Sequence, residues 1–230
     1  MATRGPTEQL AELAAGVSFA MLPAAVVDQA CHVIADAVGC AIGAIADDPP
    51  KTEIVRGLVT SFAAAPAATL WGSDVRSDPA LAALGNGILV NATDFDDTHK
   101  RALIHTGSVV VPPAIALGES LGLDGRRVVA AVVAGYEVAV RVGMAVMPSH
   151  YRYWHSTATN GTFGAAATAA SAMGLGAAGM RTALGHAGTQ AAGLNTFFTS
   201  GDFTKSLHPG KAAFNGVLAA RLASLGATTP

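Results

Sequence analysis

Apolar positions recur along most of this chain at the three- and four-residue spacing that places them on one face of an α-helix. Turn-forming residues separate these segments, and Asp78-Pro79 is typical of a helix start, since Asp can cap a helix and Pro fits its first turn. Only residues 68–72 resemble a strand. The pattern predicts an all-α, multi-helix bundle, with helices over residues 6–16, 23–45, 51–64, 79–95, 112–121, 125–146, 158–173, 177–193 and 210–225.

The composition favours helices that pack closely. Hydrophobic residues make up 51% of the 230 positions but aromatic residues only 6%, so alanine and valine supply much of the apolar surface. Alanine favours helix, and small side chains let neighbouring helices approach each other. The length allows one large domain or two small ones and is enough to bury a sizeable core.

Charge and targeting signals limit the expected partners and location. The net charge of −2 and the lack of a lysine/arginine stripe argue against a nucleic-acid partner. The first residues lack the apolar run of a signal peptide, and the longest uncharged segment, 153–180, is too rich in Gly, Ser, Thr and Asn for a membrane span. Cys31 and Cys40 fall on opposite faces of one predicted helix, so we expect two unpaired thiols and a reducing, cytoplasmic location.

Titratable side chains concentrate in residues 94–105. Only 13% of the chain is charged, yet this segment holds three aspartates, two histidines, a lysine and an arginine. Such crowding separates pKa values, which lets one site hold both an acid and a base. If the preceding helix continues into the segment, helical spacing places Asp94, Asp97 and Thr98 on one side. Asp96 would then point away. A charged, solvated helix end is the alternative interpretation.

Two further segments carry similar side chains. His155 precedes a helix of small residues, and Lys205 and His208 fall in a predicted loop over residues 194–209. His105 can fold back toward the aspartates across a short connection. Three loops that precede or follow helices can converge at one end of a helical bundle, so the sequence predicts a shared site there.

Other reactive patterns are absent from the sequence or incomplete. There is no G-x-S-x-G elbow, and Gly161–Gly164 lacks the Lys-Ser/Thr pair of a phosphate-binding loop. No two histidines have the i,i+4 spacing of a zinc site, and no second Asp-rich motif supports a magnesium-diphosphate site. We expect His32 and His186 in the core, and His150 at the surface.

Three motifs carry a family resemblance. They are Asp94-Phe95-Asp96-Asp97-Thr98-His99 with His105 downstream, His155-Ser156-Thr157 leading into Gly161-Thr162-Phe163-Gly164-Ala165-Ala166, and Lys205-Ser206-Leu207-His208-Pro209-Gly210-Lys211-Ala212-Ala213. Their order and spacing resemble the MmgE/PrpD family, whose members include 2-methylcitrate dehydratase and cis-aconitate decarboxylase. The similarity extends over essentially the whole chain. Asn91 and Thr106 depart from it, since the family usually has a histidine and a proline at these positions.

The resemblance implies a fold, a set of site residues and a partner. It implies a large helical domain over residues 1–230, usually followed in the family by an α/β lid domain, in a homodimer that needs neither a metal nor an organic cofactor. The implied catalytic residues are His105, His155, Asp94 and Lys205, and the implied substrate-binding residues are Thr98, His99, His208 and Lys211. Because the chain stops at Pro230, about where the family enters its lid, we expect that a lid is lacking or comes from a second chain.

The implied activity is a lyase acting beside a carboxylate of a small di- or tricarboxylate. Elimination develops negative charge on the substrate, so Lys205 suits anion binding, His105 and His155 suit proton transfer near neutral pH, and Asp94 orients a neighbouring cation. We expect a hydro-lyase first. Decarboxylation and epimerisation fit the same residues and are alternatives. A non-catalytic subunit that depends on a partner chain is the alternative of a different class.

Overall fold

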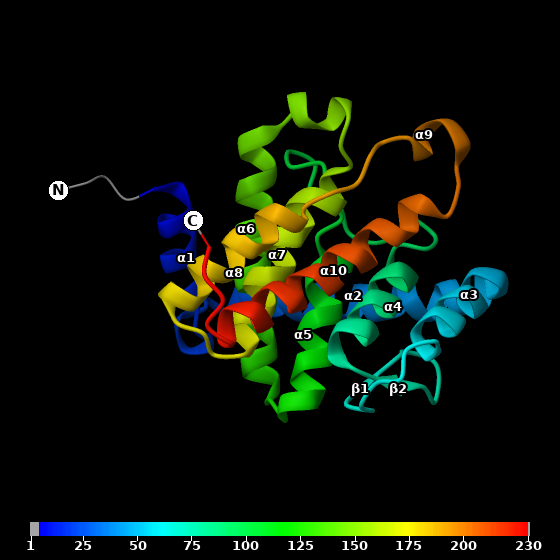
Figure 1. Cartoon of the computed structure of the whole chain (residues 1–230), viewed down its shortest axis with the longest axis horizontal. Helices are drawn as coiled ribbons and strands as arrows, with labels where there is room; N and C mark the ends of the chain where they lie inside the picture. Colours follow the sequence, from blue (N-terminus) through cyan, green and yellow to red (C-terminus); the bar gives the residue numbers. More distant parts are fainter. Residues whose placement is uncertain (1–4, 230) are drawn as a thin grey trace.

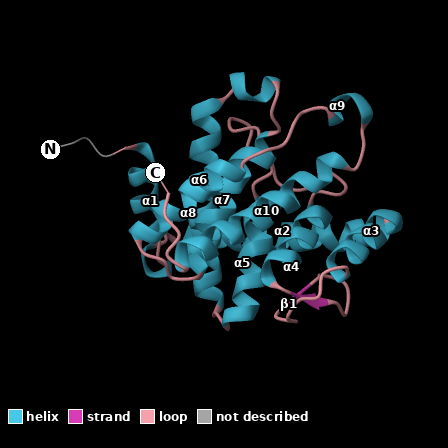
Figure 2. Ribbon diagram, in the orientation of Figure 1, coloured by secondary structure: helices cyan, strands magenta, loops and turns pink. Residues whose placement is uncertain are grey.

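The computed structural model describes residues 5–229, which form ten α-helices, two short 3-10 helices and one two-stranded sheet (Figures 1 and 2). This confirms the all-α class. The helices are α1 (Pro6–Ala15), α2 (Ala24–Asp47), α3 (Pro49–Thr60), α4 (Pro79–Val90), α5 (Gly107–Leu121), α6 (Gly125–Val146), α7 (Ser156–Ala172), α8 (Ala177–Gln190), α9 (Phe197–Ser200) and α10 (Thr204–Ser224). The 3-10 helices are η1 (Phe19–Met21) and η2 (Ser149–Arg152), and strands β1 (Ala68–Thr69) and β2 (Arg76–Ser77) pair antiparallel.

Helix α7 lies at the centre, with α5, α6, α8 and α10 packed around it (Figure 1). Small residues make this packing close. A Cβ added at Gly216 of α10 would lie 2.4 Å from the Cβ of Ala165 of α7, and one at Gly210 would lie 2.3 Å from the carbonyl oxygen of Leu84 of α4. Helix α10 therefore touches both neighbours almost backbone to backbone, as the composition predicted. This brings the end of α4 and the starts of α7 and α10 to one region.

The predicted start of α4 is confirmed. The Asp78 side chain accepts a hydrogen bond from the Ala80 N–H at 2.8 Å and also binds the Arg221 guanidinium through both carboxylate oxygens, at 2.9 and 2.8 Å. One side chain thus caps α4 and ties it to the end of α10.

Three predicted boundaries are wrong by five residues or more, and a side-chain hydrogen bond accompanies each. Helix α4 ends at Val90, where the buried Asn91 side chain turns back to Asp96, rather than at residue 95. Helix α5 begins at Gly107 rather than at Pro112, because the Asp97 carboxylate accepts the Gly107 N–H at 2.7 Å. Helix α10 begins at Thr204 rather than at residue 210, because Asp202 accepts the Thr204 N–H at 2.9 Å.

The remaining histidines and the two cysteines are partly as expected. His32 is exposed on α2, so its predicted core position is wrong, and His186 is half-buried. His150 is half-buried with its Nε2 at 2.6 Å from the Thr159 hydroxyl, because η2 folds back over α7. Cys31 and Cys40 are both free thiols, as predicted.

Helices α2 and α6 are long and apolar enough, by length and composition, to cross a membrane. The core helix of a soluble protein meets the same criterion, so this is weak support for a span. In this fold, α6 packs on α7 and α2 packs on α4 and α5. A third of the most apolar window of α2 and half of that of α6 are buried within the chain, so both helices also present apolar surface outward.

Candidate active site

The acidic segment forms a turn that folds back on the end of α4. Asp94 adopts a left-handed backbone conformation, with φ of 59°, and its N–H donates to the Asn91 carbonyl oxygen at 3.2 Å. The ammonium group of Lys51, on the first turn of α3, donates to the Ala92 carbonyl oxygen at 2.7 Å. The prediction that helical spacing turns Asp96 away from the site is therefore wrong, because the helix has already ended.

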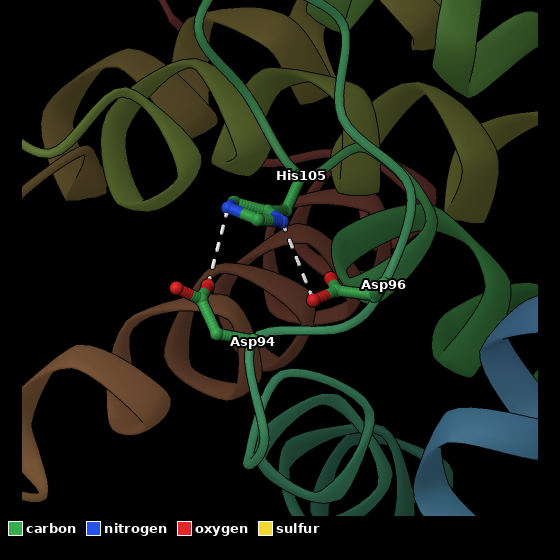
Figure 3. Close-up of side chains that lie close together, drawn as sticks. All are labelled: Asp94, Asp96 and His105. Atoms are coloured by element: carbon green, nitrogen blue, oxygen red, sulfur yellow. Dashed lines mark ion pairs between the residues drawn. The ribbon is translucent and has the colours of Figure 1, made fainter.

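His105 lies between two carboxylates of this turn (Figure 3). Its Nε2 is 3.4 Å from Oδ1 of Asp94, and its Nδ1 is 3.3 Å from Oδ1 of Asp96. Burial lowers the pKa of His105, but the hydrogen bond and charge of Asp96, together with Asp94, outweigh it and raise the pKa above its usual value. The arrangement thus favours the protonated imidazole.

Asp96 is the site residue that sequence reasoning missed. Its side chain has no exposed surface, and its Oδ1 also accepts the Asn91 amide N–H at 2.8 Å. Asn91 stands where the family usually has a histidine. This departure in the sequence was the one sign that residue 91 faces the cluster and could bind Asp96. Because Asp96 is held by Asn91 and fully enclosed, it can orient His105 through Nδ1.

Two side chains from other elements hold His105 in place. Its backbone N–H donates to the Thr157 hydroxyl of α7 at 3.2 Å, and its carbonyl oxygen accepts the Ser108 hydroxyl of α5 at 2.8 Å. The Thr98 hydroxyl lies 3.3 Å from Nδ1 of His105. The predicted contact between Thr98 and the site is therefore present, through His105.

Lys205 reaches the same cluster from the first turn of α10. Its ammonium group lies 2.5 Å from Oδ2 of Asp94 and 5.8 Å from the centre of the Phe197 ring. Burial raises the pKa of Asp94, but the hydrogen bond and charge of Lys205, with His105, outweigh it, so that the pKa is lowered and Asp94 is ionised at neutral pH. Asp94 therefore joins Lys205 and His105, one on each carboxylate oxygen.

A second pair of histidines lies beside this cluster. Nδ1 of His155, at the start of α7, is 3.0 Å from Nδ1 of His208 on α10, and the Phe197 ring packs edge-on against both imidazoles. Burial, followed by the electrostatic effect of His208, His105 and Lys205, lowers the pKa of His155 to about 3. Burial and Lys211 also lower the pKa of His208. This pair is therefore neutral where His105 is charged.

An open cavity of about 410 Å³ adjoins the cluster. Asp94 and Lys205 line it together with Lys51 of α3 and Phe197 and Phe198 of α9. It combines two ammonium groups, the two carboxylates of Asp94 and Asp202, and two aromatic rings. Asp94 is paired with Lys205 and Asp202 with Ser200 and Thr204, so the N–H groups of the two lysines that remain free can bind a small anionic molecule. A separate apolar cavity of about 250 Å³ lies between α2 and α6, with the Tyr136 ring in its wall.

Two predicted substrate-binding residues have other contacts. Nδ1 of His99 accepts the Ala102 N–H at 3.2 Å, so this side chain closes its own loop. Lys211 donates to the Gln190 carbonyl oxygen at 3.5 Å, and burial lowers its pKa. The structure thus brings together His105, His155, Asp94, Lys205, Thr98 and His208, with Lys211 one helical turn beyond His208, and leaves His99 at the edge.

Among the residues that the structure describes, Asp94, Asp96 and His105 form the one group with three ligand atoms close enough to hold a metal ion. The geometry is that of ion pairs, because each imidazole nitrogen faces a different carboxylate (Figure 3). Asp94 is also occupied by Lys205. A cation would have to displace these pairs.

Comparisons with known proteins identify the family of the chain. Residues 8–230 match the model of the MmgE/PrpD N-terminal domain. The chain therefore belongs to the MmgE/PrpD family. Its curated relatives include cis-aconitate decarboxylases of Aspergillus terreus and of Homo sapiens, each 31% identical to this chain over 96% and 98% of its length, and a cis-aconitate decarboxylase-like protein, oryM, of Aspergillus oryzae, also 31% identical.

The resemblance drawn from the sequence motifs is thus confirmed. The aligned regions cover 46% of the Aspergillus terreus enzyme and 47% of the human one, so the chain spans about half the length of these curated relatives. In this MmgE/PrpD domain, the three motifs that carried the resemblance are the segments that form the His105 cluster and the histidine pair.

Proposed function

We propose that this chain carries the acid–base residues of a cofactor-independent lyase for a small tricarboxylate, and that the reaction is a decarboxylation. The observation that carries the proposal is His105 between Asp94 and Asp96, with Lys205 on the other oxygen of Asp94. The sequence favoured a hydro-lyase. The names of the relatives favour decarboxylation instead, on the same residues.

The proposed chemistry needs one proton and one anion clamp. When a carboxylate leaves as CO₂, the electron pair of the broken C–C bond stays on the remaining fragment, which must then take up a proton at carbon. His105 is held protonated by its carboxylate neighbours and can supply that proton. Nε2 of His105 lies 3.4 Å from Asp94, which lines the cavity, so a substrate bound there that displaces the Asp94 carboxylate would reach this nitrogen.

Lys205 and His155 complete the proposed machinery. Lys205 keeps N–H groups beyond the one that binds Asp94, and these can hold a substrate carboxylate in the cavity. His155 is neutral, so it can accept or donate a hydrogen bond without adding charge. Thr98 would hold the His105 ring or a substrate oxygen. His99, His208 and Lys211 remain weaker proposals for substrate binding.

The test is turnover of cis-aconitate by the purified chain, followed by proton NMR, which distinguishes loss of a carboxylate from addition of water. CO₂ release that is lost in Lys205→Ala and His155→Ala, but kept in the matched surface variant His32→Gln, supports the proposal. Hydrated product instead of CO₂ would restore the hydro-lyase, and full activity in either site variant would remove the assignment.

A specific observation also indicates that a second protein surface covers the site. The cavity is open, and Phe198 in its wall is 62% exposed. Phe95, which follows Asp94 in the sequence, is 84% exposed. We propose that a further protein surface covers this rim, either from a second copy in a homodimer or from a second chain that supplies a lid. We also propose a cytoplasmic location, supported by the two free thiols.

Gel filtration and activity together separate these states. A monomer that turns over substrate alone excludes the need for a partner. An inactive chain that gains activity when a covering chain is added supports it, and replacing Phe95 and Phe198 with serine should then abolish the gain.

A further inference from the structure

The pair of His155 and His208 is almost fully buried, and neighbouring groups fix both rings. His155 is 1% exposed and His208 5% exposed. The backbone N–H of His155 donates to the Gly193 carbonyl oxygen at 2.9 Å, and the Phe197 ring lies 4.8 Å from the imidazole of His155 and 5.8 Å from that of His208, centre to centre. A Cβ at Gly193 would lie 2.3 Å from that of Ala158 and 3.3 Å from Nε2 of His208, so glycine is needed for this approach. The two rings are therefore held in one arrangement.

The distance between the two rings demands a hydrogen between them. Two bare nitrogens 3.0 Å apart would repel each other through their lone pairs, and two N–H groups would clash. The contact is satisfied only when one Nδ1 carries a hydrogen and the other accepts it.

The surroundings keep the pair at one proton per ring. Lys205 and Lys211 flank His208 at one helical turn on either side along α10, and His155 stands at the N-terminus of α7, where a positive charge is unfavourable. The facing carboxylates, Asp94 and Asp202, are exposed and already bound to Lys205 and to Ser200 and Thr204. Burial therefore dominates, and the pKa of each imidazole is lowered.

We propose that His208 is a positioning residue that sets the tautomer of His155 through this shared proton. With two protons on two rings and one of them between the rings, only one of the two outer Nε2 atoms carries hydrogen. When Nε2 of His155 takes up a proton, its Nδ1 proton passes to Nδ1 of His208, and the Nε2 proton of His208 leaves to water. His155 thereby changes from base to acid without becoming positively charged.

The catalytic use of this exchange rests on the proposed function, but the shared proton itself does not. The decisive experiment is therefore NMR of the full chain with ¹⁵N-labelled histidine at pH 6.5–8. His155→Gln and His208→Asn assign the two signals among the seven histidines, and His32→Gln is the matched control. We expect one imidazole protonated at Nδ1, the other at Nε2, and a scalar coupling between the two Nδ1 nuclei through the hydrogen bond.

Two Nε2-protonated rings without that coupling, or an imidazolium at either position, would overturn the proposal. A coupling between two Nδ1 nuclei identifies this pair in the unmutated chain, because His155 and His208 are the histidines whose Nδ1 atoms meet, so the test holds even if a variant fails to fold. An inactive chain that shows the coupling would refute the lyase and leave the shared proton in place.

Kinetics then tests whether the shared proton contributes to turnover. Asn at position 208 can accept or donate a hydrogen bond but cannot pass a proton on. His208→Asn should lower kcat by roughly tenfold to a hundredfold with KM nearly unchanged. An unchanged kcat in this folded variant, which has no second imidazole to share the proton of His155, would remove His208 from the reaction.

Discussion

Two histidine environments lie side by side in this molecule and act in opposite directions. His105 sits in a turn between two carboxylates, which hold its imidazole in the charged form. His155 is buried against a second histidine with lysines nearby, which hold it neutral. Titratable groups whose pKa values are pushed apart are the groups that can serve as acid and base in one site. In the proposed reaction, this difference makes His105 the proton donor and His155 the group that stays uncharged.

Removing the charged histidine should have the largest effect. His105→Gln keeps a polar side chain but cannot transfer a proton, so kcat for decarboxylation should fall by about 10²–10⁴-fold. Steady-state kinetics measures kcat of both chains at a temperature at which circular dichroism shows that each is folded. Activity within twofold of the original chain would show that the neutral pair alone supplies the proton.

Removing the ammonium group that both environments face should come next. Lys205→Ala leaves Asp94 without its partner and the cavity with one fewer cation, so kcat/KM should fall by roughly 10²–10³-fold. Lys100→Ala is the matched control, since Lys100 is exposed in the same acidic segment. Equal activity of the two variants would remove Lys205 from the site.

The acidic segment that contains His105 and the buried histidine pair should also affect the pH dependence of stability with opposite signs. In the acidic segment, the group concerned is Asp97. Burial, opposed by its hydrogen bonds to Tyr136 and Gly107, raises the pKa of Asp97 from 3.8 to about 6, with Asp96 and Asp36 adding to the rise. The folded chain therefore binds the extra proton between these values, and the Asp97 contribution to the free energy of unfolding falls by about 3 kcal/mol as pH rises through this range. His155 has a lowered pKa, so its contribution rises with pH between about 3 and 6.5.

Denaturant unfolding between pH 4 and 6.5 measures these slopes. Asp97→Asn should make the slope of unfolding free energy against pH more positive than in the unchanged chain, and His155→Gln should make it more negative. Changes of the same sign in both variants would contradict the comparison.

The smallest expected effect is a shift of the pH profile. Asp96→Asn keeps an oxygen that can accept the Asn91 amide but removes the charge that raises the pKa of His105. Because the acid must be protonated, the fall in activity at high pH should move to lower pH. Asp74→Asn, on an exposed side chain remote from the cavity, should leave the profile unchanged. If the pH profile of Asp96→Asn does not move, the loss of activity at high pH reports the titration of a group other than His105.

The fold class and the motifs could be predicted from the sequence because both depend on local pattern. Helical periodicity predicted α2, α6 and α8 within about three residues at each end, and Asp78 capped α4 as its residue type requires. The motif order also identified the family, and Asp94, His105, His155 and Lys205 were all brought to one region.

Which way each side chain points was decided by the tertiary structure. The contact between Lys205 and Asp94 joins residues 111 positions apart, and the contact between the two histidines spans 53 positions. No periodicity within one helix carries such information. Asp96 was assigned to the wrong side because the helix ends five residues early, at Val90, where the Asn91 side chain binds Asp96.

By itself, the sequence determined the helical class, the family and the identity of the reactive side chains, because these follow from residue type and spacing along the chain. Only the tertiary structure decided that Asp96 binds His105 and that His155 meets His208. The second contact depends on glycine-lined crossings, which bring α7 and α10 to within backbone contact. The folded chain thereby buries both histidines beside different charges, which raise the pKa of His105 and lower that of His155.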